Sequence, residues 1–256
     1  MSLKLHFEEI GTDNAPAVII LHGLFGSSSN WRSIARTLSQ SWRVFSLDLR
    51  NHGKSPWHDE MRYRDMAGDV AGFIAAKAID SPILIGHSMG GKTAMTLAQM
   101  LLLPLGKIFV VDIAPVPYRH NHDTLVEAMW SVNFTVQNSR SRVDQQLSKF
   151  IDEASLRQFL MQNLERRDGK LAWRLNLSAI VNNMSCLLGY EADNPVDHEM
   201  IFIAGTESDY LREKHHASVK SLFPNAVMEC INGAGHWLHA EKPGELVRII
   251  HHHLSE

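Results

Sequence analysis

Short, continuous apolar runs alternate with segments of helical hydrophobic spacing along most of this chain. The apolar runs occupy residues 17–21, 43–47, 83–85, 108–111, 200–204 and 226–231. Helical spacing occupies residues 31–38, 63–74, 91–98, 211–222 and 243–254. Continuous apolar runs of this length are typical of strands buried on both faces, and residues 3–7 alternate like an edge strand. Strands and helices in alternation predict an α/β fold with a mostly parallel sheet.

The pattern changes between residues 116 and 193. No convincing buried strand is recognisable there, whereas residues 124–130, 141–151 and 154–164 show helical spacing with long polar side chains. We therefore predict a core domain of residues 1–115 and 194–256 and a helical cap over residues 116–193 that covers the active site. The large apolar residues of the cap could line the pocket, but packing of the cap against itself explains most of them equally well. These residues are Trp130, Phe134, Trp173, Leu177 and Leu188.

Length and charge limit the kinds of partner. The 256 residues carry a formal net charge of -3, with 45% hydrophobic and 21% charged residues. These values are ordinary for a globular protein that can bury a sizeable core. Because no basic field suggests nucleic acid, we expect a neutral or modestly charged small-molecule substrate and no nucleic-acid partner. The sequence leaves a monomer and a homodimer equally open.

Targeting signals and cysteines bear on the compartment. No apolar stretch approaches the length of a membrane span, and residues 1–10 lack the apolar core of a secretory signal. Cys186 and Cys230 stand far apart and without metal-ligand spacing. We therefore expect a cytoplasmic protein with reduced thiols and no membrane association, although the sequence leaves a disulfide between the two cysteines open.

The sequence Gly-His-Ser-Met-Gly at residues 86–90 carries the first chemical signal. It follows the apolar run at residues 83–85 and precedes the helical pattern at residues 91–98, so Ser88 lies on a strand-to-helix turn. This is the setting of a nucleophile elbow, where flanking glycines leave room for a strained backbone and the hydroxyl stands above the sheet. We predict that Ser88 is a nucleophile rather than an incidental serine in a glycine-rich turn.

A second glycine-containing loop, His-Gly-Leu-Phe-Gly at residues 22–26, follows the first buried strand. Open α/β sheets bind ligands at the carboxyl ends of their strands, and backbone N–H groups there stabilise an oxyanion in hydrolases. We assign one such donor to the N–H of Leu24 or its neighbour Phe25, and the other to Met89, the residue after the nucleophile. His22 is expected to fix this loop rather than to take part in catalysis.

Two further loops supply an acid and a base. Asp112 comes directly after the apolar run at residues 108–111, which puts its carboxylate on the same rim of the sheet as Ser88. His236 follows a glycine-rich loop after the last strand and precedes the terminal helix. The chain order serine, acid, histidine predicts a catalytic triad in which His236 is the base and Asp112 orients its imidazole.

These motifs together resemble the α/β-hydrolase superfamily over essentially the whole chain and, more narrowly, the small bacterial esterases of the YbfF type. The stretches that carry the resemblance are residues 22–26, 48–53, 86–92, 111–115 and 233–243. The resemblance implies an eight-stranded, mostly parallel sheet with a helical cap. It also implies a serine carboxylesterase for short- to medium-chain acyl esters, with coenzyme A thioesters as a further substrate class and with no metal or organic cofactor.

The chain departs from the common superfamily pattern at one position. After the strand at residues 200–204, the usual acid stands three residues past Gly205, and here that residue is Ser208. Asp209 stands one position further along the chain. The resemblance to YbfF-type esterases also favours Asp112, so we prefer Asp112 as the acid and keep Asp209 as the alternative.

Other functions are open on the same residues. The scaffold supports carbon–carbon bond hydrolysis, perhydrolysis and acyl transfer, which share the triad and differ in the pocket. A serine at position 88 argues against dehalogenation, which needs a carboxylate nucleophile. An alternative from a different class is a ligand-binding receptor that has kept the hydrolase shell. Turnover well above one equivalent per protein molecule separates an enzyme from such a receptor.

Overall fold

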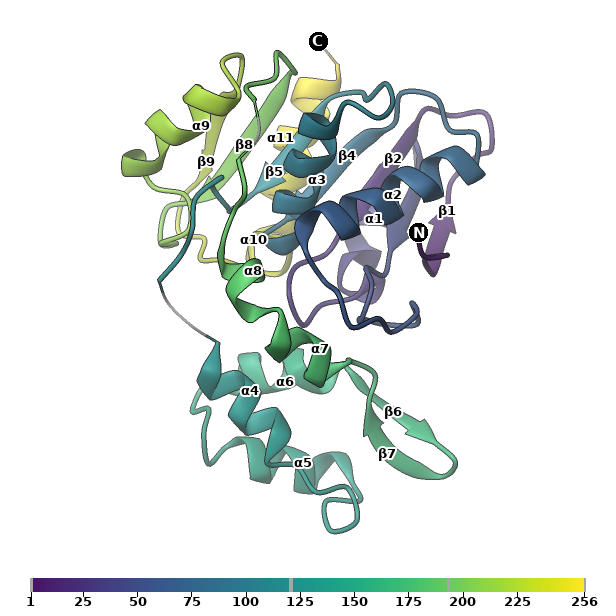
Figure 1. Ribbon diagram of the computed structural model, residues 1–256, viewed down its shortest axis with the longest axis vertical. Helices are drawn as coiled ribbons and strands as arrows, with labels where there is room; N and C mark the ends of the chain where they lie inside the picture. Colours follow the sequence, from purple (N-terminus) through teal and green to yellow (C-terminus); the bar gives the residue numbers. More distant parts are fainter. Residues whose placement is uncertain (1, 120–121, 193, 256) are drawn as a thin grey trace.

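The computed structural model describes residues 2–119, 122–192 and 194–255, and it contains a mostly parallel sheet flanked by helices (Figure 1). In spatial order the strands are β1 (Phe7–Ile10), β3 (Arg43–Leu47), β2 (Ala17–Leu21), β4 (Ile83–His87), β5 (Ile108–Val111), β8 (Met200–Gly205) and β9 (Val227–Ile231). β1 is antiparallel to β3, and the other neighbouring strands are parallel. The predicted α/β fold is therefore confirmed.

Helices cover both faces of this sheet. They are the helices α1 (Arg32–Leu38), α2 (Tyr63–Ala76), α3 (Met89–Met100), α9 (His216–Leu222), α10 (Leu238–Glu241) and α11 (Pro243–Leu254), with the short 3-10 helices η1 (Ser28–Trp31) and η2 (Glu213–His215). α2 and α3 pack on one face, and α1 and α11 pack on the other. In the described part of the chain, no helix is long and apolar enough to cross a bilayer.

Strand β2 shows why both faces need a helical layer. Its residues Val18 and Ile20 belong to the same buried cluster as the apolar residues of α1 and α11. Ile19 and Leu21 belong to the cluster formed with α2 and α3. Because alternate side chains of a strand point to opposite faces, a continuous apolar run is stable only when helices bury both sides.

The sheet has seven strands over the described residues, not the eight that the resemblance implied. The expected edge strand at residues 3–7 is also wrong in extent, because pairing begins only at its last residue. Two of the preceding backbone N–H groups bond to side chains instead. The Leu3 N–H donates to Asp69 Oδ1 at 2.6 Å, and the His6 N–H donates to Ser55 Oγ at 2.8 Å. Since these N–H groups are already satisfied, they contribute nothing to a strand ladder.

Between β5 and β8 the chain forms a group of elements that we call the cap segment, residues 122–188. Its elements are α4 (Asp123–Trp130), α5 (Arg140–Leu147), α6 (Ala154–Met161), β6 (Leu164–Arg167), β7 (Lys170–Trp173), α7 (Leu177–Asn182) and α8 (Met184–Leu188). Most of them lie together below the sheet in the view of Figure 1. The division into a core domain and a cap of residues 116–193 stays a prediction, and residue 193 lies outside the described residues.

The antiparallel pair β6 and β7 corrects the expectation that this insertion is wholly helical. The two strands are joined by Asp168 and Gly169, whose φ angles are 50° and 77°. A two-residue hairpin of type I′ needs positive φ at both turn residues, and Asp-Gly is a preferred pair for it. The hairpin therefore follows from its turn, although its strands are polar enough to escape a search for buried runs.

Strand register brings two candidate residues to one edge of the sheet. Val111 of β5 is paired with His87 of β4 and with Ile203 of β8. Ser88 and Asp112 are the next residues along their chains. Their N–H groups donate to Val111 O at 3.0 Å and to Ile203 O at 2.8 Å, respectively. The backbone ladder itself thus sets the separation between the serine and the carboxylate.

Candidate active site

Ser88 stands on a strained turn between β4 and α3. Its φ and ψ angles are 51° and -115°, a conformation that costs free energy for any residue with a side chain. Two glycines make the turn possible. A Cβ atom on Gly86 would lie 2.4 Å from Gly90 O, and one on Gly90 would lie 2.3 Å from Leu21 O. The tight turn therefore requires glycine at both positions and presents the Ser88 hydroxyl at the carboxyl edge of the sheet.

The three residues predicted as a triad form a continuous hydrogen-bonded series. Ser88 Oγ lies 3.1 Å from His236 Nε2, and His236 Nδ1 lies 2.7 Å from Asp112 Oδ2. The Asp112 side chain is fully buried, whereas that of His236 is 21% exposed. An Nδ1–H donated to the carboxylate leaves Nε2 free to accept the serine proton. The arrangement can thus activate a hydroxyl nucleophile.

Asp112 accepts more than the imidazole hydrogen bond. Its Oδ1 accepts from the Gly205 N–H at 3.1 Å, and its Oδ2 accepts from the Ser208 hydroxyl. Burial raises the pKa of Asp112 to about 7, while the bonds from Ser208 and Gly205 act in the opposite direction. Ser208, the residue at the usual position of the acid, therefore supports the carboxylate that has replaced it.

Asp209, the alternative acid, points elsewhere. Its side chain is 83% exposed and forms an ion pair with Arg212. The carboxylate that contacts His236 is that of Asp112. Ser208 and Asp209 are adjacent in the sequence, yet the side chain of Ser208 is buried and that of Asp209 is in solvent.

Two neighbours of His236 were not anticipated from the sequence. The Tyr210 ring stacks on the imidazole with centroids 3.9 Å apart and planes inclined by 20°. His87 Nε2 donates to the backbone carbonyl of His236 at 2.8 Å. Burial and the nearby His236 lower the pKa of His87 to about 3, so it remains a neutral donor. His87 lies within the Gly-His-Ser motif, whereas no sequence pattern singles out Tyr210.

The loop at residues 22–26 narrows the choice of oxyanion donor. The Phe25 N–H donates to His52 Nε2 at 3.2 Å, and the Gly26 N–H donates to Gly23 O at 3.0 Å. These bonds occupy two of the N–H groups in the loop and leave Leu24 as the better candidate. Met89 is the first residue of α3, so its N–H has no acceptor within the helix.

His22 and the loop after β3 hold this region in place. His22 donates from Nδ1 to Gly23 O at 2.8 Å and accepts at Nε2 from the Leu49 N–H at 3.0 Å. Asp48 accepts from the N–H groups of Ser28 and Lys54 at 2.7 and 2.8 Å. Both residues are nearly fully buried and contact backbone. As expected, His22 fixes the loop.

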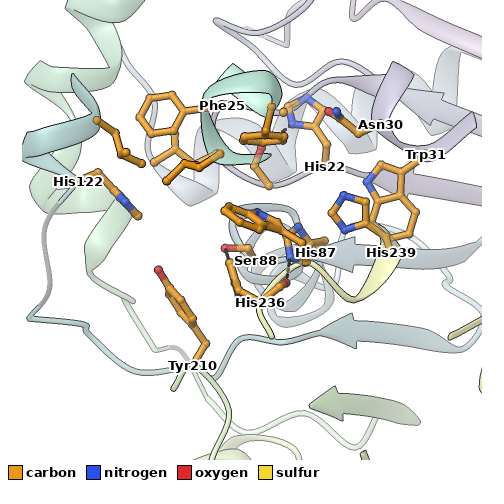
Figure 2. Close-up of a pocket in the computed structure, with 17 residues that line it drawn as sticks. His22, Phe25, Asn30, Trp31, His87, Ser88, His122, Tyr210, His236 and His239 are labelled. Carbon is orange, nitrogen blue, oxygen red and sulfur yellow. Dashed lines mark hydrogen bonds between the residues drawn. The ribbon is translucent and has the colours of Figure 1, made fainter. Parts of the chain in front are cut away.

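A cavity of about 260 Å³ lies in front of Ser88 and His236 (Figure 2). Leu125 of α4 and Leu156 and Phe159 of α6 contribute apolar side chains to its wall. The cap segment therefore bounds the space in which a substrate would lie. Its wall is largely apolar, as expected for a site that binds small organic molecules.

The cap residues named as candidates for lining the pocket mostly lie elsewhere. Trp130 is 54% exposed, and Phe134 packs edge-on against Trp173 with ring centroids 5.5 Å apart. Trp173 also donates from Nε1 to Met129 O at 2.9 Å. Leu188 does line a cavity, a second and smaller one beside Ser88. Packing of the cap against itself accounts for Phe134 and Trp173.

The chemistry available at this site is that of a hydroxyl, an imidazole and a buried carboxylate. Within residues 2–119, 122–192 and 194–255, no group of three or more His, Cys, Asp or Glu side chains is arranged to hold a metal ion. The site is therefore described by its nucleophile and its proton-transfer groups, which suit acyl transfer to serine.

Comparison with known proteins places this geometry in a family. A model of the alpha/beta hydrolase fold matches residues 16–243. Over 245 residues the chain is 35% identical to the Escherichia coli esterase YbfF, covering 95% of this chain and 94% of that protein. It is 39% identical over 249 residues to the Xenopus laevis protein named sn-1-specific diacylglycerol lipase ABHD11, covering 94% of this chain and 80% of that protein.

A solved structure described as a marine microorganism esterase superimposes with a TM-score of 0.94 at 38% sequence identity. The match covers 97% of this chain and 98% of that one. These three relatives are thus named as two esterases and a lipase. The chain belongs to the alpha/beta-hydrolase family and is a carboxylic ester hydrolase.

Proposed function

We propose that the protein is a serine carboxylesterase that cleaves short- to medium-chain acyl esters through an acyl-enzyme on Ser88. The observation that carries this proposal is the hydrogen-bonded series from Ser88 Oγ through His236 to Asp112, with distances of 3.1 and 2.7 Å. This is the geometry in which an imidazole can take a proton from a hydroxyl while a carboxylate orients the ring and stabilises its charge.

In the first half of the reaction, Ser88 Oγ attacks the ester carbonyl carbon as its proton passes to His236 Nε2. The tetrahedral intermediate collapses when His236 returns this proton to the leaving alcohol oxygen. A water molecule then attacks the acyl-enzyme and gives its proton to His236, which passes the proton to Ser88 Oγ as the carboxylic acid leaves. Asp112 remains ionised throughout and holds the imidazole in the tautomer that the cycle needs.

The developing oxyanion is assigned to two backbone donors, the N–H groups of Leu24 and Met89. The bond between the Phe25 N–H and His52 supports Leu24 over its neighbour. The position of Met89 at the start of α3 adds the positive end of a helix dipole to the same point. Removing one oxyanion donor typically costs about 3 to 4 kcal/mol of transition-state stabilisation, so these two groups matter nearly as much as the triad.

The proposal is tested by hydrolysis of p-nitrophenyl esters and coenzyme A thioesters by the wild-type protein and Ser88→Ala. We expect kcat to fall on the order of 10⁴-fold or more in the variant, because the acyl-enzyme cannot form. A fluorophosphonate should label the wild type covalently and leave the variant unlabelled. Unchanged turnover in Ser88→Ala would contradict the proposal. No turnover of any ester or thioester by the wild type would redirect the search to carbon–carbon hydrolysis or ligand binding.

A further inference from the structure

Two cavities of very different size meet at Ser88. The larger, of about 260 Å³, contains His236 in its wall. The smaller, of about 30 Å³, lies on the side of Met89 and Ile113. Ser88 lines both, as does Leu24, one of the assigned oxyanion donors. A substrate whose carbonyl carbon is attached to Ser88 therefore has two separate spaces for its two halves.

The chemistry of the reaction decides which half enters which cavity. The leaving oxygen must receive its proton from His236 Nε2, so the alcohol half must lie on the side of His236. His236 lines the larger cavity and does not line the smaller one. The oxyanion points toward the N–H groups of Leu24 and Met89. Because the alcohol and the oxyanion occupy these two directions, the acyl carbon chain must point toward Ile113.

We propose that the smaller cavity is the acyl subsite and the larger one is the alcohol subsite. The protein then acts on esters of acyl groups of two or three carbons with bulky, largely apolar alcohols. This inference rests on the proposed esterase function and narrows its acyl range. It also assigns the cap residues Leu125, Leu156 and Phe159 to recognition of the alcohol rather than the acyl chain.

The volume of the smaller cavity sets the acyl limit. One water molecule needs about 15 Å³, so about 30 Å³ holds about two non-hydrogen atoms. An acetyl or propionyl group fits beyond the carbonyl carbon. A butyryl or longer chain does not fit unless the walls move.

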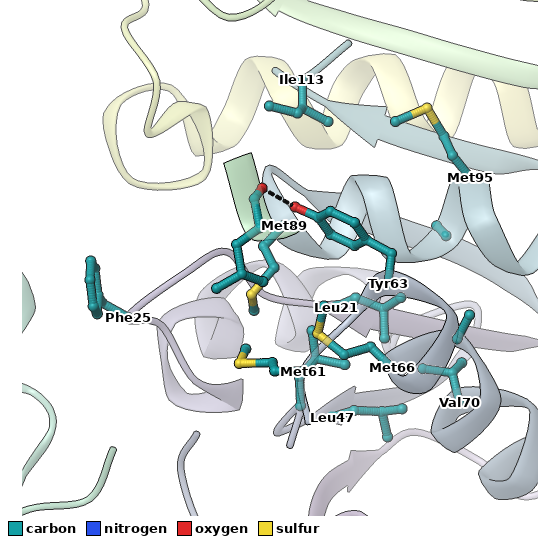
Figure 3. Packing of buried hydrophobic residues seen from close by; sticks show 14 of the residues in the cluster. Leu21, Phe25, Leu47, Met61, Tyr63, Met66, Val70, Met89, Met95 and Ile113 are labelled. Atoms are coloured by element: carbon teal, nitrogen blue, oxygen red, sulfur yellow. Dashed lines mark hydrogen bonds between the residues drawn. The ribbon is translucent and has the colours of Figure 1, made fainter. Parts of the chain in front are cut away.

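Those walls are held by buried hydrogen bonds. Tyr63 Oη donates to Leu187 O at 2.6 Å, a bond visible beside Met89 in Figure 3. Lys92 Nζ donates to Gly189 O at 2.6 Å and to Leu188 O at 3.2 Å. These bonds tie the carboxyl end of α8 to α2 and α3. Because breaking them would leave buried polar groups without partners, the smaller cavity resists widening.

The assignment is tested by two substrate series with purified protein. In the first, the p-nitrophenyl alcohol is fixed and the acyl group runs from acetyl to octanoyl. In the second, the acetyl group is fixed and phenyl acetate is compared with 1-naphthyl acetate. We expect kcat/KM to fall at least about tenfold from acetate to butyrate, because each misfitting methylene costs about that factor. We expect the naphthyl ester to be cleaved at least as well as the phenyl ester.

Matched variants separate the two cavities. Leu187→Ala enlarges the smaller cavity and should remove the difference between acetate and butyrate. Ile113→Val removes a single methyl group from the same wall, and should reduce this difference even if Leu187→Ala folds poorly. Leu156→Ala enlarges the larger cavity and should change the ratio between phenyl and naphthyl acetate while leaving the acyl preference intact.

Three results would overturn the assignment: a wild type that prefers octanoate, an acyl limit relaxed by Leu156→Ala, or an acyl limit that neither Leu187→Ala nor Ile113→Val moves. Failure of the underlying function looks different. In that case the wild type cleaves no ester of either series, or Ser88→Ala retains the activity. The acyl ratios therefore test the subsites, and the Ser88→Ala comparison tests the esterase.

Discussion

The carboxyl edge of the sheet and the cap segment hold their side chains in different ways. At the sheet edge, backbone bonds of 3.0 and 2.8 Å fix Ser88 and Asp112 directly to the strand ladder. The cap segment is attached to the same region by a backbone bond, from the Asn176 N–H to Asn51 O at 3.0 Å. It is also attached by side chains such as Asn163, whose Nδ2 donates to Phe25 O at 2.7 Å. The comparison indicates that the backbone of the core sets the chemistry. Side chains at the boundary of the cap set the shape of the cavity in front of Ser88.

The largest effect is expected where the comparison is sharpest, at the carboxylate. Asp112→Asn should lower kcat on the order of 10⁴-fold, because the amide favours the wrong imidazole tautomer and cannot stabilise its charge. Asp209→Asn should leave kcat within about twofold, since its exposed side chain contacts Arg212 instead of His236. Steady-state kinetics on p-nitrophenyl acetate measures both. A larger loss in Asp209→Asn than in Asp112→Asn would refute the assignment of the acid.

A second effect concerns the pH dependence of kcat/KM, which follows from the Asp112 carboxylate at the sheet edge. Burial raises the pKa of Asp112 to about 7, and the reaction needs its ionised form, so kcat/KM should decline as the pH falls through about 7. Ser208→Ala removes a donor that lowers this pKa, so the acidic limb should move upward by about one pH unit. Relative to the wild type, kcat/KM of Ser208→Ala should be about tenfold lower at low pH and equal at high pH. Ser208→Thr keeps the hydroxyl and is the control. An unshifted acidic limb in Ser208→Ala would argue against the role of this bond.

A smaller effect is expected where the cap meets the core. Asn163 is 3% exposed, and its amide donates to Phe25 O and to Leu160 O. Asn163→Ala leaves the buried Phe25 carbonyl without this donor. The free energy of unfolding should fall by about 1 to 3 kcal/mol, and kcat should fall several-fold because the loop that carries Leu24 is loosened. The exposed Gln158 of α6 offers a control, since Gln158→Ala should change the free energy of unfolding by less than about 0.5 kcal/mol. Equal effects of the two variants would show that the cap is not fixed through Asn163.

The smallest effect is expected far from the chemistry, at the tip of the β6–β7 hairpin. Gly169 has a φ angle of 77°, and a Cβ atom there would meet no other atom within 4 Å. Gly169→Ala should therefore cost only its backbone strain, about 1 kcal/mol of unfolding free energy, and leave kcat/KM unchanged. Thermal unfolding and ester kinetics would check both parts. A marked loss of activity would mean that the hairpin contributes to the site.

Most of the core could be predicted from the sequence because its strands are short, mainly apolar runs. The expected strands at residues 17–21, 43–47 and 108–111 agree with β2, β3 and β5 to the residue. The extent of the edge strand was wrong and the cap hairpin was missed, because their pairing depends on bonds between distant or polar residues. For the hairpin a local signal did exist in Asp168-Gly169, the turn pair between β6 and β7.

The candidate site could be predicted as a set of residues with Asp112 preferred as the acid, but the sequence left Asp209 open as the alternative. Asp112 and Asp209 both follow strands that end at the same edge of the sheet. What separates them is the loop after β8, which turns Ser208 inward to Asp112 and Asp209 outward to solvent. That turn depends on the packing of several loops around His236, including the Tyr210 ring stacked on its imidazole. No local pattern encodes such packing.

The sequence by itself therefore determined the fold class, the strained turn at Ser88 and the order of serine, acid and histidine. Local residue properties suffice for these, because apolar runs specify strands and glycines permit tight turns. Only the tertiary structure decided that Asp112 contacts His236, that Ser208 supports it, and that two unequal cavities meet at Ser88. These features arise where segments far apart in the chain meet, and the distances between such segments are fixed only when the whole core and cap are packed.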